Sequence, residues 1–302
     1  MKVDYDVIIV GAGPGGLSAA IYAARYKLKV LVFGKLLGGW AGSAHKICNF
    51  PSYIEISGME LMKKILEQVK ALGVEIISDE VKKITGKNKK FIVETHKEKY
   101  NSKKIIYAGG TVRKKLGVKD EEKYIGKGLS YCATCDATFF KGKIVVIIGG
   151  GDSALTAALL LSEYANEVII VYKQREFDNA DPTWQEQVKK NKKIRCECNE
   201  EVVEIIGDNF IEAVKLKSGK ELKVQGVFVE IGSIPDTYVL SELNIKRDKK
   251  GYIIVDKSQK TNIDGFYAVG DITNNILKQI ITAGGEGAVA GFEVYREVKK
   301  DL

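Results

Sequence analysis

The chain is poor in histidine and has no long apolar segment. His45 and His96 are its only histidines, which argues against a zinc or haem site built on histidine. No apolar run approaches the roughly 18 residues that a membrane-spanning helix needs. Met1–Asp6 leads directly into a strand-like segment, which leaves no room for a secretory signal peptide. These absences predict a cytoplasmic protein with no membrane partner.

The cysteines are odd in number and have no secretory context. Five of them in such a chain argue against a structural disulfide framework. Cys48 is expected to be a small packed residue. Cys196 and Cys198 alternate along a predicted strand and share one side of it; with no third or fourth ligand nearby, we interpret them as structural residues rather than a metal site. Only Cys132 and Cys135 have the spacing of a redox pair.

The charge is positive but not concentrated. The 47 Lys and Arg exceed the 39 Asp and Glu and give a net charge of +8. The lysines are scattered over Lys87–Lys90, Lys189–Lys193 and Lys246–Lys250 rather than gathered with aromatic residues. This pattern favours a lysine-rich solvated surface over nucleic-acid binding. An acidic redox partner attracted by the field is the alternative.

The first nucleotide motif opens the chain. Val7–Val10 is a continuous apolar run, typical of a strand buried on both faces. The loop Gly11-Ala12-Gly13-Pro14-Gly15-Gly16 follows it, then a predicted helix over Leu17–Tyr26 and a strand over Lys29–Phe33. Glycines at this spacing allow a tight turn, close approach of a pyrophosphate and close helix–strand packing. The pyrophosphate is expected at the N-terminus of the helix.

The same order of elements returns later in the chain. A predicted strand over Lys143–Ile148 leads into Gly149-Gly150-Gly151-Asp152-Ser153-Ala154, then a helix over Leu155–Ala165 and a strand over Glu167–Val171. The sequence therefore predicts an α/β protein with two Rossmann-like, three-layer domains. Further strands are expected at Phe91–Thr95, Lys104–Tyr107, Glu201–Ile206, Ala213–Leu216 and Gly226–Ile231, and a helix over Gly284–Val298.

A dithiol lies between the two motifs. Cys132-Ala133-Thr134-Cys135 can close a small disulfide ring that is reduced reversibly. Asp136 follows directly and can give or take a proton as a general acid–base. Two nucleotide sites and a dithiol predict transfer of two electrons from a nucleotide, through a flavin, to a disulfide. A buried dithiol with an incidental aspartate cap is the alternative, and the lack of a second CxxC disfavours a zinc half-site.

Five segments together carry a family resemblance: Gly11–Gly16, Gly38-Gly39 through Pro51, Ser130–Asp136, Gly149–Ala154, and Ala268–Asp271 followed by Gln279. On these the whole chain resembles the low-molecular-weight, FAD-containing thioredoxin reductases. The resemblance implies a discontinuous FAD domain at 1–113 and 245–302, with a pyridine-nucleotide domain at 114–244 that carries the cysteine pair. It also implies a homodimer through the FAD domains, and a thioredoxin-like or glutaredoxin-like disulfide as the partner.

The resemblance also implies roles for single residues. FAD would be held by Gly11, Gly13, Pro14, Gly15, Gly16, Gly38, Gly39, Asn49, Ala108, Gly109, Gly270, Asp271, Lys278, Gln279 and Ile280. Asp271 would contact the ribityl chain, although a turn capping the C-terminal helix is the alternative. Cys135 would lie against the flavin and Cys132 would attack the partner. Trp40 replaces a commoner glutamine and would either shield the flavin or fill a gap.

The chain departs from the family pattern at the residues that are expected to bind the electron donor. Dinucleotide contacts are expected from Gly149, Gly151, Asp152, Ser153, Ala154, Lys173 and Arg175. Familiar members carry His-Arg-Arg for the 2′-phosphate of NADPH, whereas this chain reads Tyr172-Lys173-Gln174-Arg175. Lys173 and Arg175 still favour NADPH. Because Glu176, Asp178 and Asp181 would repel the phosphate, NADH, ferredoxin or a reduced deazaflavin are the alternatives.

The predicted activity is thus a flavin-dependent thioredoxin-disulfide reductase without a metal site. A dithiol oxidase of the same fold, which closes a disulfide in a small molecule and passes electrons to oxygen, is the alternative reaction. A flavoprotein that has lost its donor is a third possibility.

Overall fold

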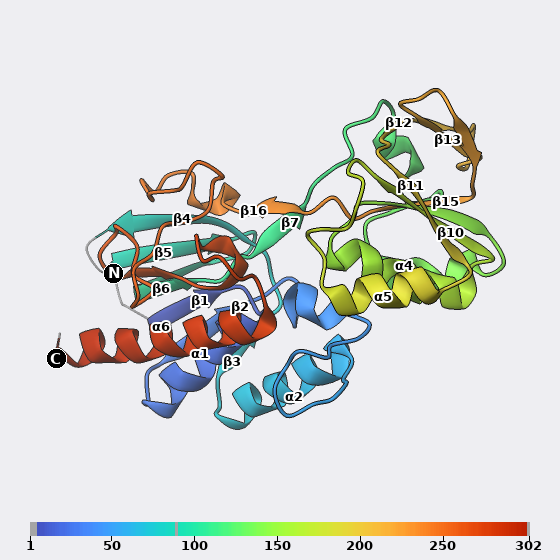
Figure 1. The fold of residues 1–302 in the computed structure, drawn as a ribbon. Coiled ribbons are helices and arrows are strands. Elements are labelled where there is room, and N and C mark those ends of the chain that lie inside the picture. Colours follow the sequence, from blue (N-terminus) through green and yellow to red (C-terminus); the bar gives the residue numbers. More distant parts are fainter. Residues whose placement is uncertain (1–4, 88–89, 301–302) are drawn as a thin grey trace. The chain divides into compact units, whose positions relative to one another are not determined.

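The computed structural model describes residues 5–87 and 90–300, which fall into two units (Figure 1). The first unit runs to Val112 and resumes at Ile234, and the second spans Arg113–Ser233. The α/β fold class is confirmed. The chain crosses from the first unit to the second near Val112 and returns at a second crossing between Ser233 and Ile234. This second crossing lies ahead of the position near residue 245 that the sequence predicts. The physical reason is that Leu240, Leu243 and Ile245 are buried in the core of the first unit.

The first unit is built on a mainly parallel sheet. Its order is β3 (Glu75–Ile77), β2 (Val30–Phe33), β1 (Tyr5–Val10) and β6 (Lys99–Tyr107), with β17 (Phe266–Ala268) also paired to β6. β5 (Lys90–Thr95) and β4 (Val81–Lys87) extend it in antiparallel fashion. β1 is almost wholly buried, as its apolar run predicts. The strands expected around Phe91–Thr95 and Lys104–Tyr107 are therefore confirmed.

Helices α1 (Pro14–Arg25), α2 (Gly58–Ala71) and α6 (Ile280–Lys300) complete the first unit. α6 packs along α1, as Figure 1 shows. The two helices can touch closely because Gly287 has no side chain. A Cβ at this position would lie 2.0 Å from the Gly15 carbonyl oxygen. Both helices begin earlier than their apolar pattern predicts.

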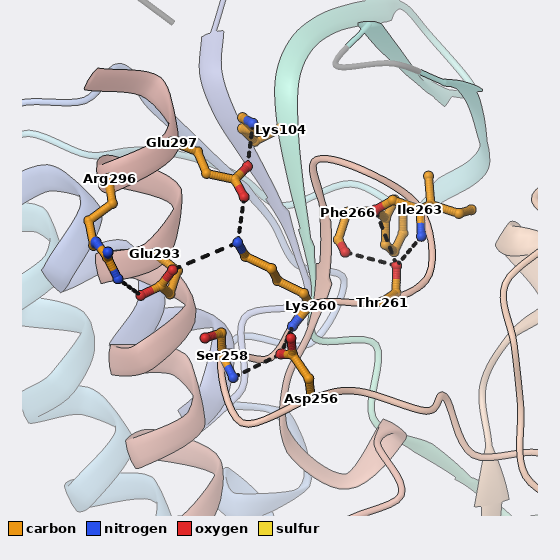
Figure 2. A network of polar contacts seen from close by, with 10 residues as sticks. All are labelled: Lys104, Asp256, Ser258, Lys260, Thr261, Ile263, Phe266, Glu293, Arg296 and Glu297. Atoms are coloured by element: carbon orange, nitrogen blue, oxygen red, sulfur yellow. Dashed lines mark hydrogen bonds and ion pairs between the residues drawn. The ribbon is translucent and has the colours of Figure 1, made fainter. Parts of the chain in front are cut away.

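A network of charged residues ties the end of α6 to the sheet (Figure 2). Lys104 on β6 is fully buried, and its Nζ lies 2.5 Å from Glu297 Oε2 on α6. Lys260 Nζ reaches Glu297 Oε1 at 2.7 Å and Glu293 Oε2 at 3.9 Å, and Arg296 contacts Glu293 at 2.7 Å. Each buried charge therefore has an opposite charge beside it, as burial requires.

The second unit is centred on a parallel sheet. Its order is β11 (Ile194–Cys198), β10 (Glu167–Tyr172), β9 (Ile144–Ile148), β15 (Gly226–Val229) and β8 (Leu129–Ser130). α4 (Asp152–Tyr164) and α5 (Pro182–Lys190) belong to this unit, as does an antiparallel sheet of β12 (Val202–Ile206), β13 (Ala213–Leu216) and β14 (Glu221–Lys223). The second strand–loop–helix–strand unit of the sequence is confirmed.

The remaining elements are short. The two crossings contain β7 (Thr111–Arg113) and β16 (Ser233–Pro235), which pair with each other. Other short elements are η1 (Gly39–Ser43), η2 (Glu121–Tyr124), α3 (Ala133–Asp136), η3 (Ala137–Phe140), η4 (Tyr238–Leu240) and η5 (Gly270–Ile272). Within 5–87 and 90–300, the helices are too short or too polar to cross a membrane.

Candidate active site

The first glycine loop contains two glycines that the fold itself requires. Gly11 has φ +117°, and a Cβ there would lie 2.1 Å from the Ala108 carbonyl oxygen. A Cβ on Gly16 would lie 1.9 Å from the Gly11 carbonyl oxygen. Pro14 then opens α1 as its first residue, where its missing N–H costs no hydrogen bond. These residues fix the turn between β1 and α1.

Gly13 has a different environment, because the space around it is open. It caps α1, and the heavy atom nearest to a Cβ would be Gly39 Cα at 3.9 Å. Gly38 and Gly39 have positive φ and bring a second glycine turn against the same place. Gly15 faces Val269 and the Gly270 nitrogen. The predicted glycines thus converge on a helix N-terminus, where free N–H groups favour an anion.

A pocket of about 290 Å³ begins at Gly11 and continues past Gly34 and Gly109. Its far side carries charged residues that the sequence reasoning missed: Lys35, Asp79, Glu80 and Lys82. Glu80 accepts hydrogen bonds from Lys82 at 2.8 Å and from Lys35 at 3.3 Å, which lower the pKa of its carboxyl. Glu80 follows β3, the neighbour of β2. Many nucleotide-binding units carry Asp or Glu at the end of the second strand, whereas Gly34 and Lys35 follow β2 in this chain. Glu80 therefore supplies a carboxylate beside the end of β2.

The predicted residues near the C-terminus lie around η5. Asn49 donates to Gln279 Oε1 at 3.1 Å, which joins two predicted residues distant in sequence. Burial raises the pKa of Asp271, an effect that Lys278 opposes. Within the described part of the chain no residue donates a hydrogen bond to the Asp271 carboxylate, so it does not cap α6. Such a half-buried acceptor is suited to a ligand hydroxyl.

Glu286 is a further acceptor that sequence reasoning missed. Its carboxylate lies on α6 and accepts the Gly270 N–H at 2.5 Å and an Asn275 side-chain N–H at 2.7 Å. Lys278 donates to the Thr273 carbonyl and lies 4.5 Å from the Tyr252 ring centroid. These contacts hold the Gly270–Asp271 turn in place.

Trp40 is held through its ring nitrogen. Nε1 donates to the Thr111 carbonyl at 2.7 Å, while the side chain stays 41% exposed. The indole therefore links η1 to β7 within the first unit.

In the second glycine loop, as in the first, the backbone requires one glycine and leaves open space beside another. Gly149 has φ +138°, and a Cβ there would lie 2.2 Å from the Glu230 carbonyl oxygen. Gly151 caps α4 and has no heavy atom within 4 Å of a Cβ position. Ala154 is fully buried, and Asp152 Oδ1 accepts the Asp181 N–H at 2.6 Å. The loop thus has open space at its helix N-terminus.

Lys173 and Arg175 lie beyond the end of β10. Both are exposed, and neither forms an ion pair with any residue in the described ranges. Tyr172 is buried and stacks on Phe177, with ring centroids 5.6 Å apart. Tyr172 therefore has a packing role, and the two cations remain available for a ligand.

The dithiol lies at α3 in the second unit. Cys132 and Cys135 form a disulfide with Cα atoms 5.3 Å apart, and the Cys135 N–H donates to Cys132 Sγ at 3.2 Å. Cys132 is half-buried and Cys135 is exposed. The Ser130 hydroxyl donates to Asp136 Oδ2 at 2.6 Å and accepts the Cys132 N–H at 3.0 Å. Ser130, absent from the predicted site residues, therefore orients both the acid and the cysteine loop.

The other three cysteines differ from the sequence expectation. Cys196 and Cys198 form a second disulfide, a bond that the sequence analysis did not predict. Their Cα atoms lie 5.4 Å apart on β11, within the range for a disulfide. Cys48 is exposed rather than packed, because it lies in the irregular segment between η1 and α2. Among the described residues, no group of three or more His, Cys, Asp or Glu could hold a metal ion.

The geometry agrees with comparisons to known proteins. The sequence profile of the pyridine nucleotide-disulphide oxidoreductases matches residues 5–287. The thioredoxin reductase of Peptoclostridium acidaminophilum is 35% identical over 100% of this chain and 99% of its own. The chain belongs to the thioredoxin reductase family. Within the family, the Lactococcus lactis enzyme has a crystal structure that matches with TM-score 0.95 and 36% identity, over 98% of this chain and 100% of that one.

Another member of the family carries a different donor in its name. A ferredoxin-flavin thioredoxin reductase from Clostridium acetobutylicum is 35% identical over 98% of each chain, with TM-score 0.55. The names of the two relatives above mention no electron donor.

Proposed function

We propose that this chain is a flavin-dependent thioredoxin-disulfide reductase that passes two electrons through Cys132 and Cys135 to the disulfide of a thioredoxin-like protein. The observation that carries the proposal is the Cys132–Cys135 disulfide beside Asp136, whose carboxylate lies 2.6 Å from the Ser130 hydroxyl. A disulfide this short in sequence, with one exposed cysteine, is suited to reversible exchange. FAD, when bound, supplies two-electron storage between donor and disulfide.

The first unit fits FAD in three respects. Open space at Gly13 lets a pyrophosphate approach the N-terminus of α1. The pocket between Gly11 and Glu80 offers room for the adenosine end, with the Glu80 carboxylate as acceptor for ribose hydroxyls. Asp271, with no donor among the described residues, offers a second acceptor for ribityl hydroxyls. We assign the other predicted residues of this unit to the same cofactor.

The reduced dithiol would act in two exchange steps. The Cys132 thiolate attacks one sulfur of the partner disulfide, forming a mixed disulfide and releasing the partner's other sulfur as a thiolate. Cys135 then attacks Cys132 Sγ, which re-forms the Cys132–Cys135 bond and releases the second partner thiolate. Asp136 donates a proton to a leaving thiolate. Ser130 holds the Asp136 carboxylate in position for this transfer.

A turnover assay tests the function. The purified protein should be yellow and should reduce thioredoxin with a reduced donor. Cys135→Ser should lose at least 99% of turnover while keeping its flavin. Wild-type protein that consumes oxygen with a small dithiol, and does not reduce thioredoxin, would instead identify a dithiol oxidase.

For the donor we propose NADPH, supported by two exposed cations at the end of β10 that have no ion-pair partner among the described residues. Lys173 and Arg175 can reach a 2′-phosphate above the open Gly151 position. Replacing both by alanine should raise KM for NADPH roughly 10²-fold or more, since each charged hydrogen bond contributes about 1.5–3 kcal/mol, and should leave KM for NADH unchanged. Flavin that stays oxidised when mixed anaerobically with either nucleotide would instead indicate a ferredoxin-type or deazaflavin donor.

We also propose a homodimer through the first unit. α1 and α6 leave Tyr22, Tyr26 and Phe292 exposed by 42%, 37% and 39%. Aromatic residues of this kind are enriched at protein interfaces. Sedimentation velocity should give twice the chain mass, and Phe292→Glu should shift it to the monomer.

A further inference from the structure

The second disulfide lies at the open edge of the second unit's sheet. β11 is the last strand in the order of this sheet, and among the described residues it pairs only with β10. Cys196 lies opposite Ile170 and is exposed, whereas Cys198 lies opposite Tyr172 and packs against the core. The two cysteines of this bond therefore differ in their exposure to solvent. A partner that approaches the sheet edge meets Cys196 first.

The size of the ring argues against a structural staple. A disulfide stabilises mainly by restricting the unfolded chain, and the effect grows with the length of the closed loop. The Cys196–Cys198 ring encloses only Glu197, so it restricts the unfolded chain very little. Exposed disulfides are instead the labile, regulatory or catalytic ones.

The charges around the pair do not oppose an incoming thiolate. Glu197, between the two cysteines, would repel a thiolate if it stood alone. Its carboxylate lies 2.7 Å from Lys220 Nζ and also pairs with Arg195. Arg195 in turn contacts Glu167 at 2.5 Å. The acids next to the pair are therefore balanced by cations.

We propose that Cys196–Cys198 is a second thiol–disulfide exchange site, at which the thiolate of a protein dithiol attacks the sulfur of Cys196. Cys198 leaves as a thiolate and takes up a proton, so that a mixed disulfide joins Cys196 to the partner. The partner's second thiolate then attacks its own bonded sulfur and releases Cys196. The partner is oxidised to a disulfide and both cysteines are reduced. The reductant class, a reduced thioredoxin-like protein, rests on the proposed function.

The test counts thiols, so it does not depend on turnover. Cys132→Ser/Cys135→Ser removes the first pair and leaves three of the five cysteines. The protein is oxidised in air, without a small disulfide that would form a mixed disulfide with the exposed Cys48, and is then desalted. It is then treated with purified thioredoxin that was reduced beforehand and freed of small thiols, and alkylated for intact mass. We expect one alkylated thiol before treatment, from Cys48, and three after it. The matched control, which also carries Cys196→Ser/Cys198→Ser, should show one thiol both times.

Three results would overturn the proposal. The first is three thiols before treatment, since the pair would then not be bonded under oxidising conditions. The second is one thiol after a large excess of reduced thioredoxin, when the unfolded and chemically reduced protein shows three. The third comes from a thioredoxin that lacks its resolving cysteine. Fragment-ion mass spectrometry of the peptide that holds both cysteines should locate this thioredoxin on Cys196, and trapping on Cys198 would refute the assigned sulfur. Wild-type turnover, measured separately, tests the proposed function.

Thermal unfolding distinguishes an exchange site from a structural disulfide. Oxidised and reduced forms of the same protein should differ in Tm by no more than about 4 °C, because the ring contributes little to stability. A larger fall on reduction would show that the bond is structural.

Discussion

Single residues in the two glycine loops serve two different needs. Gly11 and Gly149 have positive φ and no room for a Cβ, so the backbone itself requires them. Gly13 and Gly151 have negative φ and open space, so a side chain would fit the protein. What a side chain would disturb at the second kind of position is a ligand. The two kinds can therefore be separated by alanine substitution.

Gly13→Ala should give a folded protein that lacks flavin. The added methyl group meets no heavy atom nearer than 3.9 Å, so we expect a loss of stability of about 1 kcal/mol at most. It does occupy the space over the α1 N-terminus where a pyrophosphate would lie. The ratio of flavin to protein absorbance and far-UV circular dichroism measure the two effects.

The matched control for this substitution is Gly11→Ala. A Cβ 2.1 Å from the Ala108 carbonyl oxygen cannot be accommodated, so this variant should fail to fold. A Gly13→Ala protein that retains one FAD per chain would contradict the assignment of this loop to the cofactor.

Asp136→Asn should slow turnover roughly 10²-fold, because general acid–base catalysis is worth at least that much. Asparagine keeps an oxygen that can accept the Ser130 hydroxyl, so the cysteine loop should stay intact. Flavin content and Tm should therefore be unchanged, and steady-state kinetics with thioredoxin measures the effect. Ser130→Ala should have a smaller effect, because it only positions the acid. Unchanged turnover in Asp136→Asn would exclude a proton-transfer role.

Sequence patterns predicted the residues that belong to a motif and missed those that do not. Gly11, Gly149 and the Cys132–Cys135 pair stand in fixed spacings with a physical cause. Glu80 lies in the pocket after the end of β3, and Glu286 on α6 accepts the Gly270 N–H. Both are distant in sequence from the glycine motifs, so only the folded structure shows that they belong to the site. The sequence places Cys196 and Cys198 on one side of a strand. A spacing of two, however, does not by itself indicate a bond.

At the scale of elements, the charged network at α6 makes stability depend on pH. Burial disfavours the ionised form of Glu297, but hydrogen bonds from Lys104 and Lys260 outweigh it and lower its pKa to about 2. A carboxyl with a lowered pKa contributes stability above its unfolded pKa of about 4.3. That contribution is lost as the pH falls from about 5 toward 2.

Glu297→Gln should remove this part of the acid sensitivity. We expect a loss of about 1–2 kcal/mol at pH 7, which is less than the full pKa difference because the Glu297 side chain is 18% exposed. The difference between wild type and variant should shrink toward pH 2, as followed by urea unfolding at several pH values. Lys99, an exposed lysine paired with Glu94, supplies the control, since Lys99→Met should change stability by less than about 1 kcal/mol. A pH-independent difference would contradict the assignment.

Reduction of the second disulfide should loosen the strand end that follows it. The Asn199 N–H donates to the Gln174 carbonyl and the Glu200 N–H to the Tyr172 carbonyl, both at 3.1 Å. An extended strand would place the Cys196 and Cys198 Cα atoms about 6.6 Å apart, instead of the 5.4 Å observed. Reduction lets β11 lengthen there, so hydrogen exchange at 199 and 200 should accelerate several-fold. Equal exchange in both redox states would show that the bond does not influence this segment.

The strand–loop–helix–strand order of both Rossmann-like units followed from periodicity, because buried parallel strands are continuous apolar runs. The sequence analysis did not predict α2, α5, β3 or β4. Their ends were less predictable. α1 begins at Pro14 and α4 at Asp152, ahead of the apolar pattern, since the glycine cap and not the first apolar residue decides where each helix starts.

At the scale of the whole molecule, each unit has its own core. In the described ranges, the core clusters of the first unit draw only on residues before 113 and after 233, and those of the second only on residues between them. The sequence placed the second crossing too late because 234–244 has no strong apolar pattern. Its few apolar residues nevertheless complete the first core.

The crossings make a deletion of the second unit feasible. The Asp236 N–H donates to the Gly110 carbonyl and the Lys114 N–H to the Gly232 carbonyl, both at 3.1 Å, so the incoming and outgoing chains run side by side. A chain of 1–112 joined to 234–302 by a short glycine linker should therefore fold and bind FAD. Residues 113–233 alone should fold without colour and keep the Cys132–Cys135 pair.

Neither fragment should reduce thioredoxin, because the flavin and the dithiol are then on separate chains. Flavin fluorescence, cooperative thermal melts and thiol counts on the two purified fragments measure each part of this prediction. A colourless first fragment with a cooperative melt would show that FAD needs residues of the second unit. A first fragment that does not melt cooperatively would mean that its core depends on the inserted chain, contrary to the separate clusters.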